Sequence, residues 1–152
     1  MIPSLTLRPF PNSFQLWDMT VSIKAAGAET NGLFCIVERT LPPYYRKEAP
    51  HWHAATTEAF YVVDGALTFT LDDQTFIAQR GSVVVVSPRT VHLYWNSTAS
   101  PVTFLTTAAP GGLECLLAEL SALFAKHPYE AMRATEVAAR YDHYAPAEND
   151  AC

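Results

Sequence analysis

The chain has 152 residues, of which 49% are hydrophobic and 16% are charged, so it is long enough to bury the core of one ordinary domain. Its formal net charge is −5 and its ten Lys and Arg residues are scattered, which argues against nucleic acids and anionic membranes as partners. No apolar run reaches the roughly 18 residues of a membrane-spanning helix, and the first residues lack the pattern of a secretory signal. We therefore expect a cytoplasmic protein.

The first 41 residues predict an arm and two strands. Residues 1–13 carry three prolines and no clear periodicity, which is typical of an arm or an edge extension. Apolar and polar positions then alternate over 14–24, which predicts one strand. A loop ending in the turn dipeptide Asn31-Gly32 leads into the apolar run 33–41, which predicts a buried strand.

The middle of the chain predicts a series of short strands. Turn signals recur every 8–12 residues, as in all-β sandwiches and barrels. The four consecutive valines at 83–86 indicate a fully buried strand. The expected strands cover 58–63, 66–71, 75–78, 82–87, 90–95 and 102–107.

The periodicity changes after residue 110. Leucines and a phenylalanine recur at helical spacing over 113–125, and a second segment rich in Ala and Arg, 129–141, is also expected to be helical. We therefore expect one domain in three parts. These are an arm and first strand at 1–30, a β-barrel core at 31–110 and a C-terminal helical extension at 111–152.

Three of the five histidines and one glutamate form a candidate metal site. His51 and His53 are two residues apart on an extended segment, so their side chains point to the same side. Glu58 shares a predicted strand face with apolar residues, where an unpaired carboxylate would be costly. His92 also lies among apolar neighbours. Three imidazoles and a carboxylate form a good site for Fe, Mn, Ni, Co, Cu or Zn.

The spacing of these residues resembles the two sequence motifs of the cupin family. His-x-His, four residues, Glu58, six residues and Gly65 resemble the first motif. Gly81, six residues, Pro88, three residues, His92, three residues and Asn96 resemble the second. The resemblance covers about 30–110 and implies a double-stranded β-helix, or jelly roll, with one divalent metal ion on His51, His53, Glu58 and His92.

Two positions depart from the cupin pattern. Tyr45 stands where the first motif usually begins with Gly, and Arg89 stands where the second motif usually carries Gly. We expect the Arg89 change to alter the turn before His92 and to let the Arg89 side chain reach the barrel mouth. Neither departure affects a proposed metal ligand.

Within the cupins, the chain is similar to small proteins described as quercetin-dioxygenase-like, through stretches such as TEAFYVVDGALTFTLDDQ and PRTVHLYWN. This resemblance implies a metal-dependent oxidoreductase acting on a small enolic or phenolic compound, with Glu58 as a ligand or as a base beside the metal. A metal-dependent isomerase, lyase or hydrolase is one alternative. A small-molecule binding or sensing protein without turnover is another.

Several further side chains are assigned more general roles. Trp52 and Trp95 are expected to face away from the metal, and His127 and His143 are expected to be solvated surface. Glu38, Arg39 and Arg46 are candidates for the pocket mouth, although solvated surface is the preferred interpretation.

Because small cupins commonly pair through their sheets, we expect a homodimer. The pocket for a small-molecule substrate is expected among Phe60, Val62, Phe69, Val84, Val86, Tyr94 and Phe104.

Overall fold

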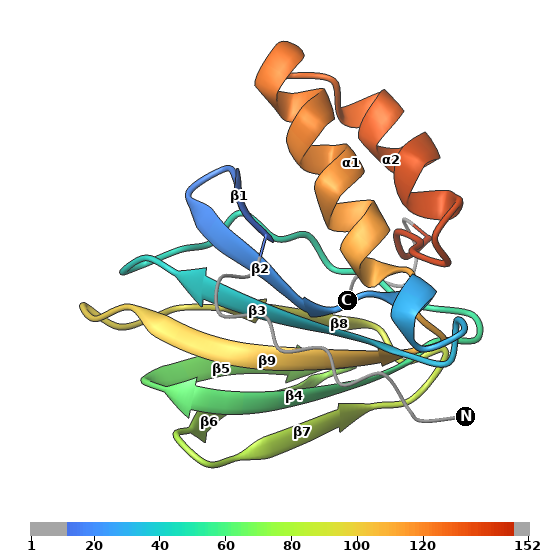
Figure 1. Cartoon of the computed structure of the whole chain (residues 1–152). Helices are drawn as coiled ribbons and strands as arrows, with labels where there is room; N and C mark the ends of the chain where they lie inside the picture. Colours follow the sequence, from blue (N-terminus) through green and yellow to red (C-terminus); the bar gives the residue numbers. More distant parts are fainter. Residues whose placement is uncertain (1–11, 148–152) are drawn as a thin grey trace.

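Two antiparallel sheets form the body of the molecule in the computed structural model, which describes residues 12–147 (Figure 1). The larger sheet has the strand order β1-β2-β3-β9-β4-β7, and the smaller has the order β6-β5-β8. The strands are β1 (Asn12–Leu16), β2 (Met19–Ala25), β3 (Cys35–Leu41), β4 (Thr57–Asp64), β5 (Ala66–Leu71), β6 (Gln74–Gln79), β7 (Val83–Val86), β8 (His92–Trp95) and β9 (Val102–Ala109).

Alternating burial in the strands builds the core between the sheets. In β3 and in β9 every second side chain is buried, because successive side chains of a strand point to opposite faces. The two strands pair along their whole length, with Arg39 opposite Phe104. Phe60, Phe69, Tyr94 and Phe104 are among the largest fully buried side chains. The expected all-β jelly roll with a C-terminal helical region is confirmed.

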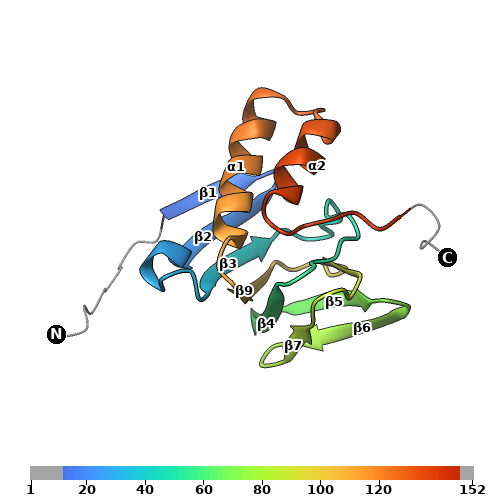
Figure 2. The same cartoon turned by 90° about the vertical axis from the view of Figure 1, so that its right-hand side faces the viewer.

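Two helices extend the barrel at one end of the larger sheet. They are α1 (Leu113–Lys126) and α2 (Ala131–Ala139), and they lie side by side in Figure 2. Leu117 of α1 joins the barrel core, and Phe124 packs against Trp17 with ring centroids 5.1 Å apart. Leu116 instead packs with Val137 and Ala138 of α2. The helix pair therefore has its own small core. None of the helices between residues 12 and 147 is long and apolar enough to cross a membrane.

Two strand predictions were wrong in an informative way. The predicted single strand at 14–24 is a hairpin, because the chain turns at Trp17, whose φ of 52° lies in the left-handed region. The valine run is not fully buried. β7 is an outer strand of its sheet, and Val83 and Val85 are 61% and 58% exposed. The predicted N-terminal arm at 1–13 lies almost wholly outside the described residues.

Two turn glycines offer a matched test of the fold. Gly65 and Gly81 have φ values of 84° and 85°, but a Cβ on Gly65 would lie 2.8 Å from the carbonyl oxygen of Pro101. A Cβ on Gly81 would meet nothing within 4 Å. We expect Gly65→Ala to lower the free energy of unfolding by about 2–4 kcal/mol, since left-handed strain and steric overlap add.

The Gly81→Ala variant is the control for that measurement. It carries only the left-handed strain and should lose about 1–2 kcal/mol in the same urea titration. Equal losses in the two variants would show that the close approach of Gly65 to Pro101 has no energetic role.

Candidate metal centre

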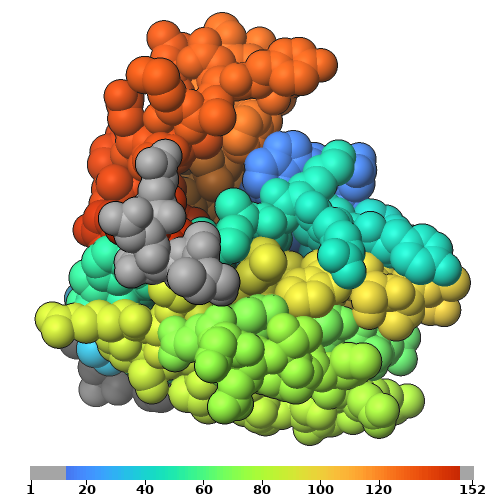
Figure 3. Space-filling view, turned by 180° about the vertical axis from the view of Figure 1, so that it is seen from behind, coloured from blue at the N-terminus to red at the C-terminus, as the bar shows by residue number. Residues whose placement is uncertain are grey.

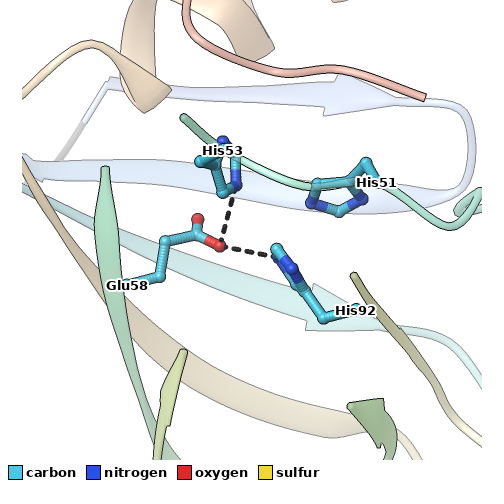
Figure 4. Close-up of side chains that lie close together, drawn as sticks. All are labelled: His51, His53, Glu58 and His92. Carbon is cyan, nitrogen blue, oxygen red and sulfur yellow. Dashed lines mark hydrogen bonds and ion pairs between the residues drawn. The ribbon is translucent and has the colours of Figure 1, made fainter. Parts of the chain in front are cut away.

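Four buried side chains from three parts of the chain converge at one end of the barrel (Figure 4). His51 and His53 precede β4, Glu58 lies on β4 and His92 begins β8. One potential ligand atom from each of the four residues lies within 4.8 Å of all the others. The Oε2 atom of Glu58 is 3.2 Å from Nε2 of His53 and 3.0 Å from Nε2 of His92. The structure thus brings the four predicted ligands together.

Backbone carbonyl groups fix the orientation of all three imidazoles. A carbonyl oxygen only accepts, so each Nδ1 carries a hydrogen, and Nε2 of His53 and Nε2 of His92 face the Glu58 carboxylate instead. This arrangement orients metal-binding histidines in proteins generally. The three bonds run from His51 Nδ1 to Ala49 O at 3.0 Å, from His53 Nδ1 to Asp142 O at 2.6 Å and from His92 Nδ1 to Thr90 O at 3.0 Å.

The charges in the cluster also suit a cation. Burial by itself raises the pKa of Glu58, but hydrogen bonds from His53 and His92 outweigh it and hold that pKa well below its usual value. Burial likewise opposes protonation of His53, but Glu58 outweighs it and raises the pKa of His53. Burial, with the neighbouring His143 and His92, lowers the pKa of His51. An anionic carboxylate thus accepts hydrogen bonds from Nε2 of His53 and Nε2 of His92, and a divalent ion would replace the protons in those two bonds.

The two departures from the cupin pattern leave the site intact. Arg89 has a φ of 68°, the left-handed conformation that favours glycine, which explains why the motif carries Gly there. The Arg89 N–H donates to the carbonyl of His53 at 2.7 Å, so this turn contacts the loop that carries the first two ligands. The Arg89 side chain is exposed. Tyr45 is buried in the core, and its carbonyl accepts from the N–H of Asn96 at 3.0 Å.

A segment after α2 completes the centre, and the sequence analysis missed it. The Asp142 carboxylate accepts from the N–H groups of Ala54, Ala55 and Thr56 at 2.7–2.9 Å and from the Thr56 hydroxyl at 2.8 Å. The carbonyl of the same residue holds His53. Asp142 therefore fastens the C-terminal segment to the loop that carries the first two ligands.

The prediction that His143 is solvated surface was wrong. Its ring stacks on that of His51, with centroids 3.9 Å apart and planes 14° from parallel. Its Nδ1 is buried and has no hydrogen-bond partner within residues 12–147. His127, by contrast, is exposed. Trp52 faces away from the centre as expected and packs against Tyr144. No short-range pattern marks Asp142 or His143, because they reach the site through the helix pair.

A cavity of about 640 Å³ adjoins the centre and extends between the barrel and the helix pair. His51 and Glu58 line it, together with Arg39, Tyr94 and His143. Among the predicted pocket residues only Tyr94 lines this cavity. The others, Phe60, Val62, Phe69, Val84, Val86 and Phe104, belong to the core between the sheets.

The preferred prediction for Arg39, solvated surface, was also wrong. It is only 3% exposed and donates hydrogen bonds to the Tyr94 hydroxyl and the Thr106 hydroxyl. The alternation of buried residues in β3 contains the signal that was overlooked. Arg39 is in phase with Val37 and Leu41, so it points inward.

Comparison with known proteins identifies the fold. The model of the Cupin domain family matches residues 37–108. No curated protein sequence shows significant similarity to the chain. Many solved structures do resemble it.

Three of these structures illustrate the range. KdgF from Halomonas sp. is 16% identical with a TM-score of 0.61, and the match covers 72% of this chain and 99% of that one. The cupin domain of an XRE family transcriptional regulator from Enterobacter cloacae is 24% identical with a TM-score of 0.54, and the match covers 60% of this chain and 96% of that domain. A sugar phosphate isomerase of the cupin superfamily from Silicibacter pomeroyi is 21% identical with a TM-score of 0.54. That match covers 62% of this chain and only 60% of the isomerase. At these identities the likeness establishes the fold alone.

Asp142 provides a test of how the centre is held. The four hydrogen bonds outweigh burial and lower the pKa of Asp142, so its stabilising effect is complete above about pH 4 and is lost as the pH falls below that value. We expect Asp142→Asn to cost about 1–2 kcal/mol at neutral pH, since its amide group cannot accept from all these donors. Hydrogen exchange should show faster exchange at the amides of residues 54–56.

The control for this test is Asp73→Asn, in the exposed turn between β5 and β6. It should leave exchange at residues 54–56 unchanged. Unchanged exchange in the Asp142 variant as well would refute the anchoring role.

Proposed function

We propose that this chain, which has the cupin fold and a buried cluster of four potential metal ligands, is a metal-dependent oxidoreductase of the dioxygenase type, acting on a small enolic or phenolic compound. The observation that carries the proposal is the convergence of three imidazoles and one carboxylate beside a largely apolar cavity. A structural metal site is closed by its protein ligands, whereas a catalytic site keeps access for other molecules. Here both His51 and Glu58 line the cavity.

The residues of the chain have separable roles in this proposal. A divalent ion would supply Lewis acidity and, for a redox-active metal, electrons for dioxygen chemistry. His51, His53, Glu58 and His92 would hold it, and the backbone carbonyls that bind the Nδ1 atoms would keep the rings aimed. Glu58 also borders the cavity, so it is placed to accept a proton from a substrate hydroxyl. The apolar walls exclude water and favour a planar organic ligand.

Metal analysis is the first test of this proposal. We expect protein purified without tag or chelator to hold close to one equivalent of a transition metal. The double variant His51→Ala/His92→Ala should lose it, because too few ligands remain for tight binding. His127→Ala, which changes an exposed histidine, is the matched control and should retain the metal.

The metal then directs the assay for turnover. Fe, Mn, Ni, Co or Cu leads to oxygen-uptake measurements with enolic and phenolic compounds. Zinc without oxygen uptake would instead favour an isomerase, lyase or hydrolase using Lewis-acid chemistry. Protein that takes up none of these ions after reconstitution would refute a metal-dependent enzyme.

We also propose that the protein is a homodimer. The outer face of β4 and β7 carries an apolar patch of Tyr61, Val63, Val83 and Val85, all at least 36% exposed. Tyr61 and Val83 are paired neighbours in the sheet. A contiguous exposed apolar patch is typical of an interaction surface.

Light scattering during size-exclusion chromatography tests this proposal. We expect a mass of twice the 16.8 kDa chain. Val85→Glu should shift the protein to monomer, because it places a charge within the apolar patch. Ile77→Glu, at an exposed position on β6 of the other sheet, should stay dimeric. A monomeric wild-type protein would contradict the proposal.

A further inference from the structure

The cavity beside the metal centre has two chemically different ends. Figure 3 shows the recess between the helix pair and the hairpin of β1 and β2. At the barrel end the lining includes Arg39, Glu58 and Tyr94. At the other end it is formed by apolar residues of the two helices. A ligand that fills the whole cavity must therefore combine a polar group with an apolar body.

Arg39 gives the polar end an unpaired positive charge. A guanidinium stays protonated even when buried, and burying a charge is costly without a counter-ion. Within residues 12–147 Arg39 makes no ion pair, and its hydrogen bonds go to the neutral hydroxyls of Tyr94 and Thr106. Its guanidinium also lies 5.0–5.6 Å from the ring centroids of Phe60, Tyr94 and Phe104, which lessens the cost of burial only in part.

The other charged residues of the cavity do not compensate Arg39 fully. Lys47 is already paired with Asp18 at 2.6 Å. Glu58 is shared between His53 and His92. Burial raises the pKa of Glu48, although the charge of Arg39 opposes this effect, and the two side chains form no ion pair within residues 12–147. The polar end of the cavity therefore favours an anionic group over a neutral one.

The helix pair leaves space because its facing residues differ in size. Leu113, Leu116, Leu120 and Phe124 of α1 line the cavity. Opposite them α2 contributes Ala131, Ala134 and Ala138. Alanine leaves a gap that larger side chains would fill, so the cavity continues between the helices as an apolar slot. Water finds no hydrogen-bond partners in such a slot, whereas a hydrocarbon chain or ring is stabilised there by removal of its apolar surface from water.

We propose that the ligand of this cavity is an amphipathic organic anion, whose ionised oxygen group lies at Arg39 and the metal centre and whose apolar body lies between α1 and α2. As an identification of the substrate, this inference rests on the proposed function. It narrows that function to enolates or carboxylates bearing an extended apolar chain or ring. The cavity volume of about 640 Å³ is ample for a chain of ten carbons.

Calorimetric titration with decanoate as the probe tests the inference. Decanoate should bind the purified protein at least tenfold more tightly than butanoate, which lacks the apolar body, and than decanol, which lacks the charge. Arg39→Gln should abolish the preference for decanoate over decanol. Ala134→Trp, which fills the slot, should weaken decanoate at least tenfold. Ala139→Trp, on the exposed side of α2, is the matched control and should bind decanoate as the wild type does.

The outcomes separate this inference from the proposed function. Equal affinity for decanoate and butanoate would overturn the inference, as would unchanged decanoate binding in Ala134→Trp. This second variant decides the matter even if Arg39→Gln does not fold. Decanoate binding by protein that takes up no transition metal after reconstitution would support the pocket and refute the metal enzyme. One equivalent of bound metal without decanoate binding would support the metal enzyme and overturn the inference about the pocket.

Discussion

The centre depends on one costly feature, a carboxylate buried at the end of an apolar strand face. Glu58 is 2% exposed and shares its face of β4 with Phe60 and Val62. A buried anion persists only when it is paired and hydrogen-bonded, and the Nε2 atoms of His53 and His92 supply the partners. Each of these two rings is buried, so its other nitrogen, Nδ1, also needs a hydrogen-bond partner. The burial of Glu58 therefore depends also on the backbone carbonyls of Asp142 and Thr90, which accept from Nδ1 of His53 and Nδ1 of His92.

Much of this arrangement could be predicted from the sequence, because it follows from short-range periodicity. A strand repeats every two residues, so the spacing of His51 and His53 places them on one side, and the alternation in β3 and β9 defines the core face. The same rule failed for the valine run. Four valines fit a strand covered on both faces, and nothing local to the run reveals that β7 lies at the edge of its sheet with one face uncovered.

The rest of the site could not be predicted, because it comes from a distant part of the chain. Asp142 lies more than 80 residues from the backbone groups it binds, and it reaches them only because α1 and α2 fold back over the barrel. The first helix was predictable from its leucine spacing and the second from a segment rich in Ala and Arg. The direction in which they return was not, because it depends on the packing of Leu117 and Phe124 against the barrel. Arg39 is different, since its inward direction follows from strand alternation, and the usual preference of arginine for the surface obscured it.

The helix pair also joins the metal centre to the cavity through one continuous piece of chain. Ala131, Ala134 and Ala138 of α2 line the apolar slot, and the chain then runs without interruption to Asp142 and His143. Any displacement of α2 that changes the width of the slot must therefore act on the carbonyl that holds His53 and on the ring that covers His51. A barrel alone would offer an open mouth above its ligands. Here the segment that encloses the mouth also orients two of the three imidazoles, so the shape of the cavity and the geometry of the metal ligands are set by the same contacts.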